Sequence, residues 1–136
     1  MDITLEQVQG KAQITIVHIK GRVDGTNYRD LMAKAAEAYT AGARNFLIDL
    51  SDVPYMSSAG LAAIQSIVQM SRGEKPIGEE AGWDTLHSIN REESKGQHTH
   101  VKLLEPQPGV DKVLDLAGIK NFLPVFADRD AAIASF

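Results

Sequence analysis

The sequence predicts a single α/β domain in which helices pack against a mixed β-sheet, and three observations support this prediction. Apolar and polar residues alternate at 3–8 and 12–19, and this period of two is typical of strands with one buried face. Apolar residues at 28–39 instead follow the period of a helix. The segment 46–50 is short and nearly continuously apolar, as in a strand buried on both faces of a parallel sheet.

Length and composition agree with one folded domain and exclude several functional classes. The 136 residues are 43% hydrophobic and 24% charged, with a formal net charge of −4, which is typical of a globular protein and argues against nucleic-acid binding. The absence of cysteine excludes disulfides, thiolate metal sites and a cysteine nucleophile. No apolar run reaches the roughly 20 residues of a membrane helix, and the N-terminus does not resemble a secretory signal. We therefore expect a cytoplasmic protein without membrane insertion.

The N-terminal half is predicted to form a hairpin followed by a βαβ unit. Gly10-Lys11 separates the two alternating segments and indicates a tight connection. The next helix should be capped by Thr26 or Asn27 and end at Gly42. Its buried face is formed by Tyr28, Leu31, Met32, Ala35, Ala36 and Tyr39. A helix between the hairpin and the strand at 46–50 predicts a right-handed parallel crossover.

A second helix is expected at 59–70, after a turn at 51–58. Apolar residues surround most of its circumference. Leu61, Ile64 and Val68 form a stripe that faces the core, whereas Ile67 and Met70 need another partner. That partner is either a second protein or the chain's own segment 71–100.

Residues 71–100 differ from the rest of the chain and are predicted to be an inserted polar loop. Only five of these thirty residues are hydrophobic, and ten are charged. A loop of this length is uncommon inside a compact domain. Trp83, Leu86 and Ile89 are spaced three residues apart, so they could form one short helix that docks on the domain.

The regular pattern returns after this loop. We expect a strand at 101–104, a helix opened by Pro106 and Pro108 and ended by Gly118, a short edge strand at 122–126, and a last helix at 129–134 capped by Asp128. The complete prediction is one domain over 1–136, with an N-terminal hairpin, βα units after it and about four helices.

Most signatures of catalysis are missing. One glycine-rich segment has the spacing of a phosphate-binding loop, but Glu79 and Glu80 stand where such a loop needs Lys and Ser or Thr. His98 and His100 have no third metal ligand nearby in the sequence, and His18 lies on the polar side of its strand, where we expect it to be exposed. We therefore predict no enzymatic activity, no metal and no cofactor.

One candidate site remains, at the end of the strand 46–50 and the beginning of the next helix. Ser57 and Ser58 stand where that helix begins, so one of them should be its N-cap. Gly60 allows the helix to pack closely on the sheet. This structural explanation requires no further function.

The same segment resembles the serine loop of the STAS domain family, whose bacterial members include the anti-sigma factor antagonists. That loop has an aspartate, an apolar stretch and then Asp-Ser-Ser/Thr-Gly-Leu at a helix start, and the matching positions here are Asp52, Val53, Tyr55, Met56, Ser58, Gly60 and Leu61. Segments 20–24, 45–50 and 113–119 also resemble the family, in the same order. The chain departs from the pattern in its serine loop, where Ser57 replaces the usual acid and Ala59 stands where the family often has Ser or Thr, and in the added polar segment 71–100.

The resemblance implies a phosphorylation-switched binding module that regulates transcription. When unphosphorylated, the module would hold an anti-sigma factor that has serine kinase activity. Phosphorylation of Ser58, or of Ser57 as a substitute target, would release that partner, and a phosphatase would reset the switch. The expected partner surface consists of Asp24, Asp52, Tyr55, Met56, Ser57, Ser58, Gly60, Ile67 and Met70.

Two alternatives stay open. The chain could be a STAS subunit or scaffold of a signalling complex or lipid-transport system, with a docking surface and no phospho-switch. It could also be a small-ligand sensor in which the segment 71–100 forms a lid.

Overall fold

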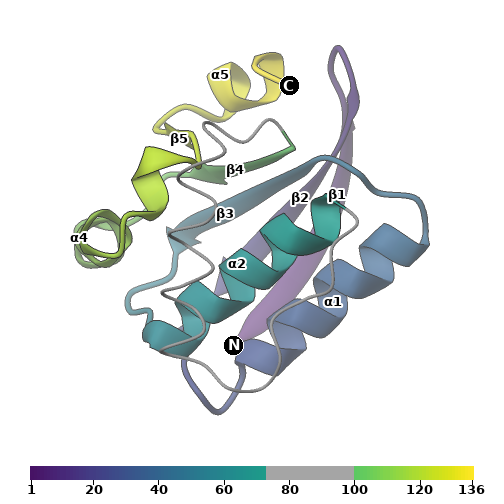
Figure 1. Cartoon of the computed structure of the whole chain (residues 1–136). Coiled ribbons are helices and arrows are strands. Elements are labelled where there is room, and N and C mark those ends of the chain that lie inside the picture. Colours follow the sequence, from purple (N-terminus) through teal and green to yellow (C-terminus); the bar gives the residue numbers. More distant parts are fainter. Residues whose placement is uncertain (73–99) are drawn as a thin grey trace.

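The computed structural model describes residues 1–72 and 100–136 (Figure 1). The strands are β1 (Asp2–Gln9), β2 (Gln13–Lys20), β3 (Phe46–Asp52), β4 (Val101–Leu104) and β5 (Val125–Phe126). The helices are α1 (Tyr28–Thr40), α2 (Ser58–Ser71), α4 (Pro108–Leu116) and α5 (Arg129–Ala134), with a 3-10 turn η1 (Ile119–Asn121). The predicted docking helix around Trp83, Leu86 and Ile89, the glycine-rich segment with Glu79 and Glu80, and His98 all lie outside the described residues.

The strands form one mixed sheet in the order β1-β2-β3-β4-β5. β1 and β2 pair antiparallel as a hairpin, and every later neighbouring pair is parallel. Parallel neighbours need a crossover connection, and α1 is the crossover between β2 and β3. The predicted α/β architecture is therefore confirmed.

Two helices cover one face of the sheet. Figure 1 shows α1 and α2 lying side by side across this face. The face of the sheet toward them is made by Val17 and Ile19 of β2 and by Ile48 and Leu50 of β3, all of which are buried. These residues form one continuous core with the inward side chains of α1, α2 and α4, so this face supports the helix that begins at the serines.

The opposite face of the sheet holds a smaller core under the C-terminal helix. Ile14, Ile16 and Leu47 point to this side and cluster with Leu104 and with Ala132 of α5. Asp128 caps α5 as predicted, because its carboxylate accepts hydrogen bonds from the backbone N–H groups of Asp130 and Ala131. β2 is consequently buried on both faces, and the prediction of one buried face for this strand was wrong.

Two further details differ from the sequence prediction. Asn27 occupies the N-cap position of α1, but its side chain makes no capping hydrogen bond to the helix and instead accepts one from the N–H of Asp24. The edge strand begins only at Val125, because Phe122 and Leu123 belong to the turn after η1, where they are buried in the main core.

His18 is not simply exposed, as its place on the strand had suggested. Its Nδ1 lies 2.8 Å from a carboxylate oxygen of Asp49, and its Nε2 lies 2.8 Å from one of Glu6. Arg129 of α5 contacts the other oxygen of Glu6 at 2.6 Å. Glu6 therefore connects β1 both to β2 and to the C-terminal helix α5. The hydrogen bond with Arg129, followed by that with His18, holds the pKa of Glu6 below its usual value.

This lowered pKa predicts a small acid sensitivity. A carboxyl with a lower pKa in the folded protein stabilises it above the ordinary pKa near 4.5, and this contribution is lost as pH falls through the folded value. Because the Glu6 side chain is 41% exposed, we expect Glu6→Gln to cost less than about 1 kcal/mol at pH 7. Urea unfolding at pH 7 and pH 3 should show the difference from wild type shrinking in acid. Glu37→Gln, on the exposed side of α1, is the control.

Candidate partner-binding site

The loop between β3 and α2 is fixed by the segment that follows β2. The Gly21 N–H donates to the carbonyl of Asp52 at 3.0 Å, and the Val23 N–H donates to that of Tyr55 at 3.1 Å. The N–H of Ser57 in turn donates to the Val23 carbonyl at 2.9 Å. These bonds extend the parallel pairing of β2 and β3 beyond the sheet, with one isolated bridge between Val23 and Met56. The two segments therefore form one ordered unit at the carboxyl end of the parallel strands.

Ser57 is the N-cap of α2, and Ser58 is the first residue of the helix. Ser57 has an extended backbone, and its Oγ accepts a hydrogen bond from the N–H of Ala59 at 3.2 Å. Ser58 is exposed. No hydrogen bond of its hydroxyl occurs within residues 1–72 and 100–136. The prediction that one of the two serines caps this helix is therefore confirmed for Ser57, and the two serines have different environments.

Ser57→Ala should destabilise the fold, because it removes the acceptor for the N–H of Ala59. Loss of an N-cap costs about 1 kcal/mol, which urea denaturation can resolve. Ser58→Ala is the matched control on the adjacent residue, and we expect it to change stability by less than about 0.5 kcal/mol. A larger loss for Ser58→Ala than for Ser57→Ala would contradict this assignment of the cap.

Two predicted partner residues lie under the loop rather than on its surface. Met56 is only 2% exposed, and Gly60 is buried directly beside it. A Cβ atom added to Gly60 would lie 2.4 Å from Cγ of Met56 and 3.2 Å from a methyl group of Val23. Met56 and Gly60 therefore set the shape of the loop, and a partner would not touch them directly in this conformation.

The exposed residues of the site are Tyr55, Ser58 and Asp52, next to partly exposed Ser57 and Asp24. Tyr55 is 47% exposed and is one of three exposed large hydrophobic side chains among the described residues, with Met1 and Leu116. The guanidinium of Arg22 lies 5.1 Å from the centre of this ring. Arg22 was not predicted as a site residue, and only its position beside Asp24 in the segment 20–24 pointed to it.

Asp24 serves the local structure of the site. Its carboxylate accepts hydrogen bonds from the backbone N–H and the hydroxyl of Thr26. These two bonds are the main reason why the pKa of Asp24 lies below its usual value. Asp24 also lies 3.9 Å from Arg22. The carboxylate is therefore charged and fixed in the turn between β2 and α1.

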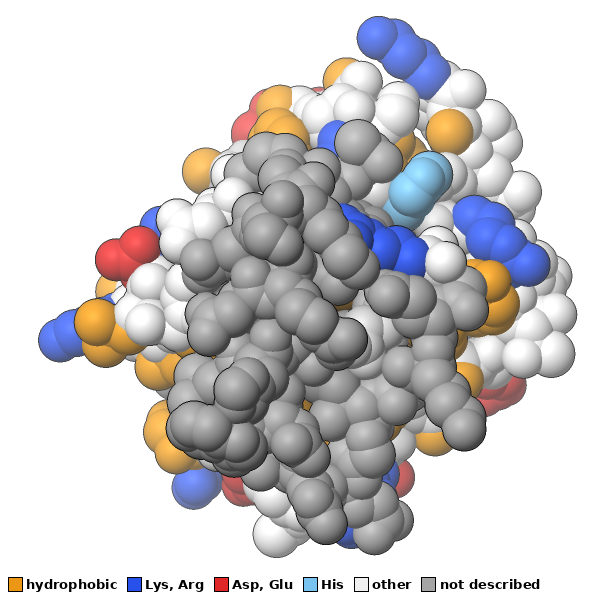
Figure 2. Space-filling view, viewed as in Figure 1, with side chains coloured by type: hydrophobic (Ala, Val, Ile, Leu, Met, Phe, Trp, Pro, Cys, Tyr) orange, Lys and Arg blue, Asp and Glu red, His pale blue; other side chains and the backbone are white. Residues whose placement is uncertain are grey.

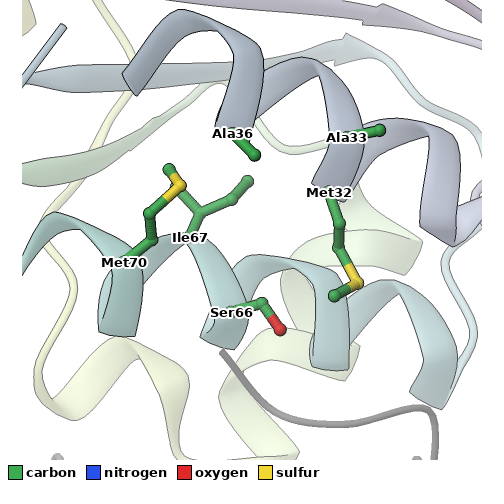
Figure 3. A pocket seen from close by; sticks show the side chains of 6 residues that line it. All are labelled: Met32, Ala33, Ala36, Ser66, Ile67 and Met70. Carbon is green, nitrogen blue, oxygen red and sulfur yellow. The ribbon is translucent and has the colours of Figure 1, made fainter. Parts of the chain in front are cut away.

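Ile67 and Met70 are not part of this surface. They are 1% and 9% exposed, and they lie on α2 against Met32 and Ala36 of α1 (Figure 3). Ile67 comes nine positions after Ser58 in the helix, a distance of about 13 Å along the axis. The surplus apolar residues of α2 therefore face α1, and the expectation that they form one surface with the serines was wrong.

The described residues offer no other obvious chemistry. No helix among them is long and apolar enough to cross a membrane. Within 1–72 and 100–136, no three His, Asp or Glu side chains come together as a metal site. Basic and acidic side chains are interspersed around the outline of the face shown in Figure 2. His100, the described member of the predicted histidine pair, contacts the side-chain oxygen of Asn45 at 2.9 Å.

Comparison with known proteins identifies a domain family that matches about half of the chain. The model of the STAS domain matches residues 6–75, which include the whole serine loop and α2. A protein of Bordetella bronchiseptica, described as "Putative anti-sigma factor antagonist BtrV", is 26% identical over 136 residues. The alignment covers all of this chain and 95% of that relative.

Solved structures show the same fold. An anti-sigma factor antagonist from Mycobacterium paratuberculosis aligns with a TM-score of 0.64 at 17% identity, over 98% of this chain and 93% of its own. The Bacillus cell fate determinant SpoIIAA, in its phosphorylated form, aligns with a TM-score of 0.53 at 15% identity, over 96% of both chains. At these identities the likeness concerns the fold alone.

Proposed function

The chain belongs to the STAS domain family, and we propose that it is an anti-sigma factor antagonist controlled by phosphorylation of Ser58. In its unphosphorylated form it binds an anti-sigma factor that has serine kinase activity, and a sigma factor is set free. Phosphorylation by that partner ends the binding, and a phosphatase restores it. The partner supplies ATP and magnesium, so this chain acts as a binding protein without a cofactor in the cytoplasm. The general role is supported by two similar proteins, which are both described as anti-sigma factor antagonists.

The observation that carries the proposal is the contrast between the two serines. The Ser57 hydroxyl caps α2, whereas the Ser58 side chain is exposed in the first turn of that helix, directly after a loop held by backbone hydrogen bonds. A kinase can reach the Ser58 hydroxyl without opening the helix. Modification of Ser57 would instead disturb the cap. This contrast favours Ser58 over Ser57 as the target.

A phosphate on Ser58 is compatible with the fold. It adds about −1.5 to −2 charge at neutral pH. The first turn of a helix presents unpaired N–H groups and the positive end of the helix dipole, both of which favour an anion. The first turn of α2 contains no acidic residue that would repel it. We therefore expect the phosphorylated protein to keep its structure.

The same phosphate would prevent a partner from packing on the loop. A protein that covers Tyr55 and Ser58 would remove the dianion from water, and an unpaired buried charge costs several kcal/mol. Each 1.4 kcal/mol corresponds to a tenfold change in affinity. Binding can thus be switched by charge alone, with no large change in shape.

Phosphosite mapping tests this proposal directly. The full-length protein is incubated with candidate anti-sigma factors and MgATP, and the modified residue is identified by mass spectrometry. We expect phosphate on Ser58 in the wild type and in Ser57→Ala, and none in Ser58→Ala. Phosphate on Ser57 would move the switch by one residue and keep its mechanism. Stable binding with no phosphate on either serine would instead indicate a docking module without a switch.

A further inference from the structure

We infer that His18 is a pH-sensitive joint, which holds β1, β2, β3 and α5 together while its imidazole ring is protonated. Nδ1 of this ring lies 2.8 Å from Oδ2 of Asp49 on β3, and Nε2 lies 2.8 Å from Oε1 of Glu6 on β1. The second oxygen of Glu6 contacts Arg129 of α5 at 2.6 Å. One ring on β2 thus links four elements. The inference concerns the sheet and does not depend on the proposed phosphorylation of Ser58.

The two contacts of His18 require an N–H group on each ring nitrogen. An ionised carboxylate only accepts hydrogen bonds, and a neutral imidazole has one N–H and one bare nitrogen. A neutral ring would therefore point a nitrogen lone pair at a carboxylate oxygen 2.8 Å away. Glu6 is ionised at neutral pH, because its hydrogen bond with Arg129, followed by that with His18, holds its pKa below the usual value. The carboxylate of Asp49 is oriented by the N–H of Ser51, which donates to its other oxygen at 3.0 Å.

The charges around the ring also favour its positive form. Apart from Glu6, Asp49 and Arg129, the charged residues in the same hollow of the sheet or beside Arg129 are Asp2, Lys20, Asp52 and Asp130. Carboxylates therefore outnumber cationic groups on the elements that face His18. Nearby charges of opposite sign favour the charged form of a titratable group.

The joint is buried enough for its charges to matter. The side chains of His18 and Asp49 are 31% and 14% exposed, and salt and water screen partly buried pairs less than exposed ones. Histidine ordinarily changes charge between about pH 5 and 8. A proton that the folded chain holds more tightly than the unfolded chain stabilises the fold, and this contribution disappears as the pH rises and the ring becomes neutral. We therefore expect the joint to weaken in alkaline solution.

Thermal unfolding of the full-length protein at pH 6 and pH 9 tests the joint. Glutamine keeps a polar side chain but carries no charge at either pH. We expect His18→Gln to lower Tm by about 3–5 °C at pH 6 and by less than about 1 °C at pH 9. Thr4→Val is the matched control, because Thr4 is an uncharged residue that pairs with His18 across β1 and β2 and lines the same hollow. It should change Tm equally at both pH values.

The protonation of the ring can also be observed directly. Two-bond correlation spectra of hydrogen and ¹⁵N distinguish an imidazole with two N–H groups from one with a single N–H. At pH 7.5 we expect two N–H groups on His18 in the wild type and in Thr4→Val. A neutral ring at this pH would overturn the inference, because the proton shared with Asp49 would then lie on the carboxyl group. Equal losses of Tm at pH 6 and pH 9 for His18→Gln would also overturn it, since His18 would then be a purely structural residue.

Discussion

Ser58→Asp should weaken binding to the anti-sigma factor by about 100-fold or more, while Ser58→Ala should bind with wild-type affinity and resist release by MgATP. The carboxylate places a charge where the partner would cover it, and burial of an unpaired charge costs several kcal/mol. The variant should still fold, because a carboxylate in the first turn of a helix interacts favourably with its dipole. Isothermal titration with the purified partner measures both affinities.

A matched control for the added charge is available on another helix. Ala131→Asp places the same carboxylate in the first turn of α5, on an exposed residue far along the chain from the serine loop. We expect its affinity for the partner to equal that of the wild type. If Ser58→Ala and Ser58→Asp bind the partner equally well, the switch at Ser58 is wrong, and the loop is an unregulated docking surface.

The sequence predicted the elements well because their signals are local. The alternating pattern at 12–19 and the apolar run at 46–50 each indicate a strand within a few residues, and both strands are present. Asp128 was correctly assigned as a cap because its position before an amphipathic segment has few alternatives. The order of these elements was then sufficient to predict the mixed sheet.

The errors concern contacts between distant segments. Ser57 and Ser58 are equally suitable caps by residue type, and the choice is fixed by the hydrogen bond from Ser57 to Val23, more than 30 residues earlier. His18 appeared exposed because its partner Asp49 lies on another strand. Ile67 could be recognised as a residue in need of a partner, but periodicity does not reveal that α1 provides it.

The close approach at Gly60 predicts a large effect on stability. Gly60→Ala should reduce the free energy of unfolding by about 1–3 kcal/mol, the usual cost of overpacking. The added methyl group would lie 2.4 Å from Cγ of Met56, whose side chain is enclosed beneath the loop. Urea denaturation measures the loss. Because Met56 shapes the loop that carries Ser58, we also expect weaker binding to the anti-sigma factor.

Gly109→Ala is the matched control, because Gly109 is also in the first turn of a helix but has nothing within 4 Å of an added Cβ atom. Because alanine has a better helix propensity than glycine, Gly109→Ala should leave the free energy of unfolding unchanged or raise it by up to about 1 kcal/mol. The loss at Gly60 should also shrink when Met56→Ala is introduced first, since the clashing atoms are then absent. If Gly60→Ala is as stable as Gly109→Ala, then Met56 can move aside at no cost, and the loop is not held in the rigid shape that the proposed switch requires.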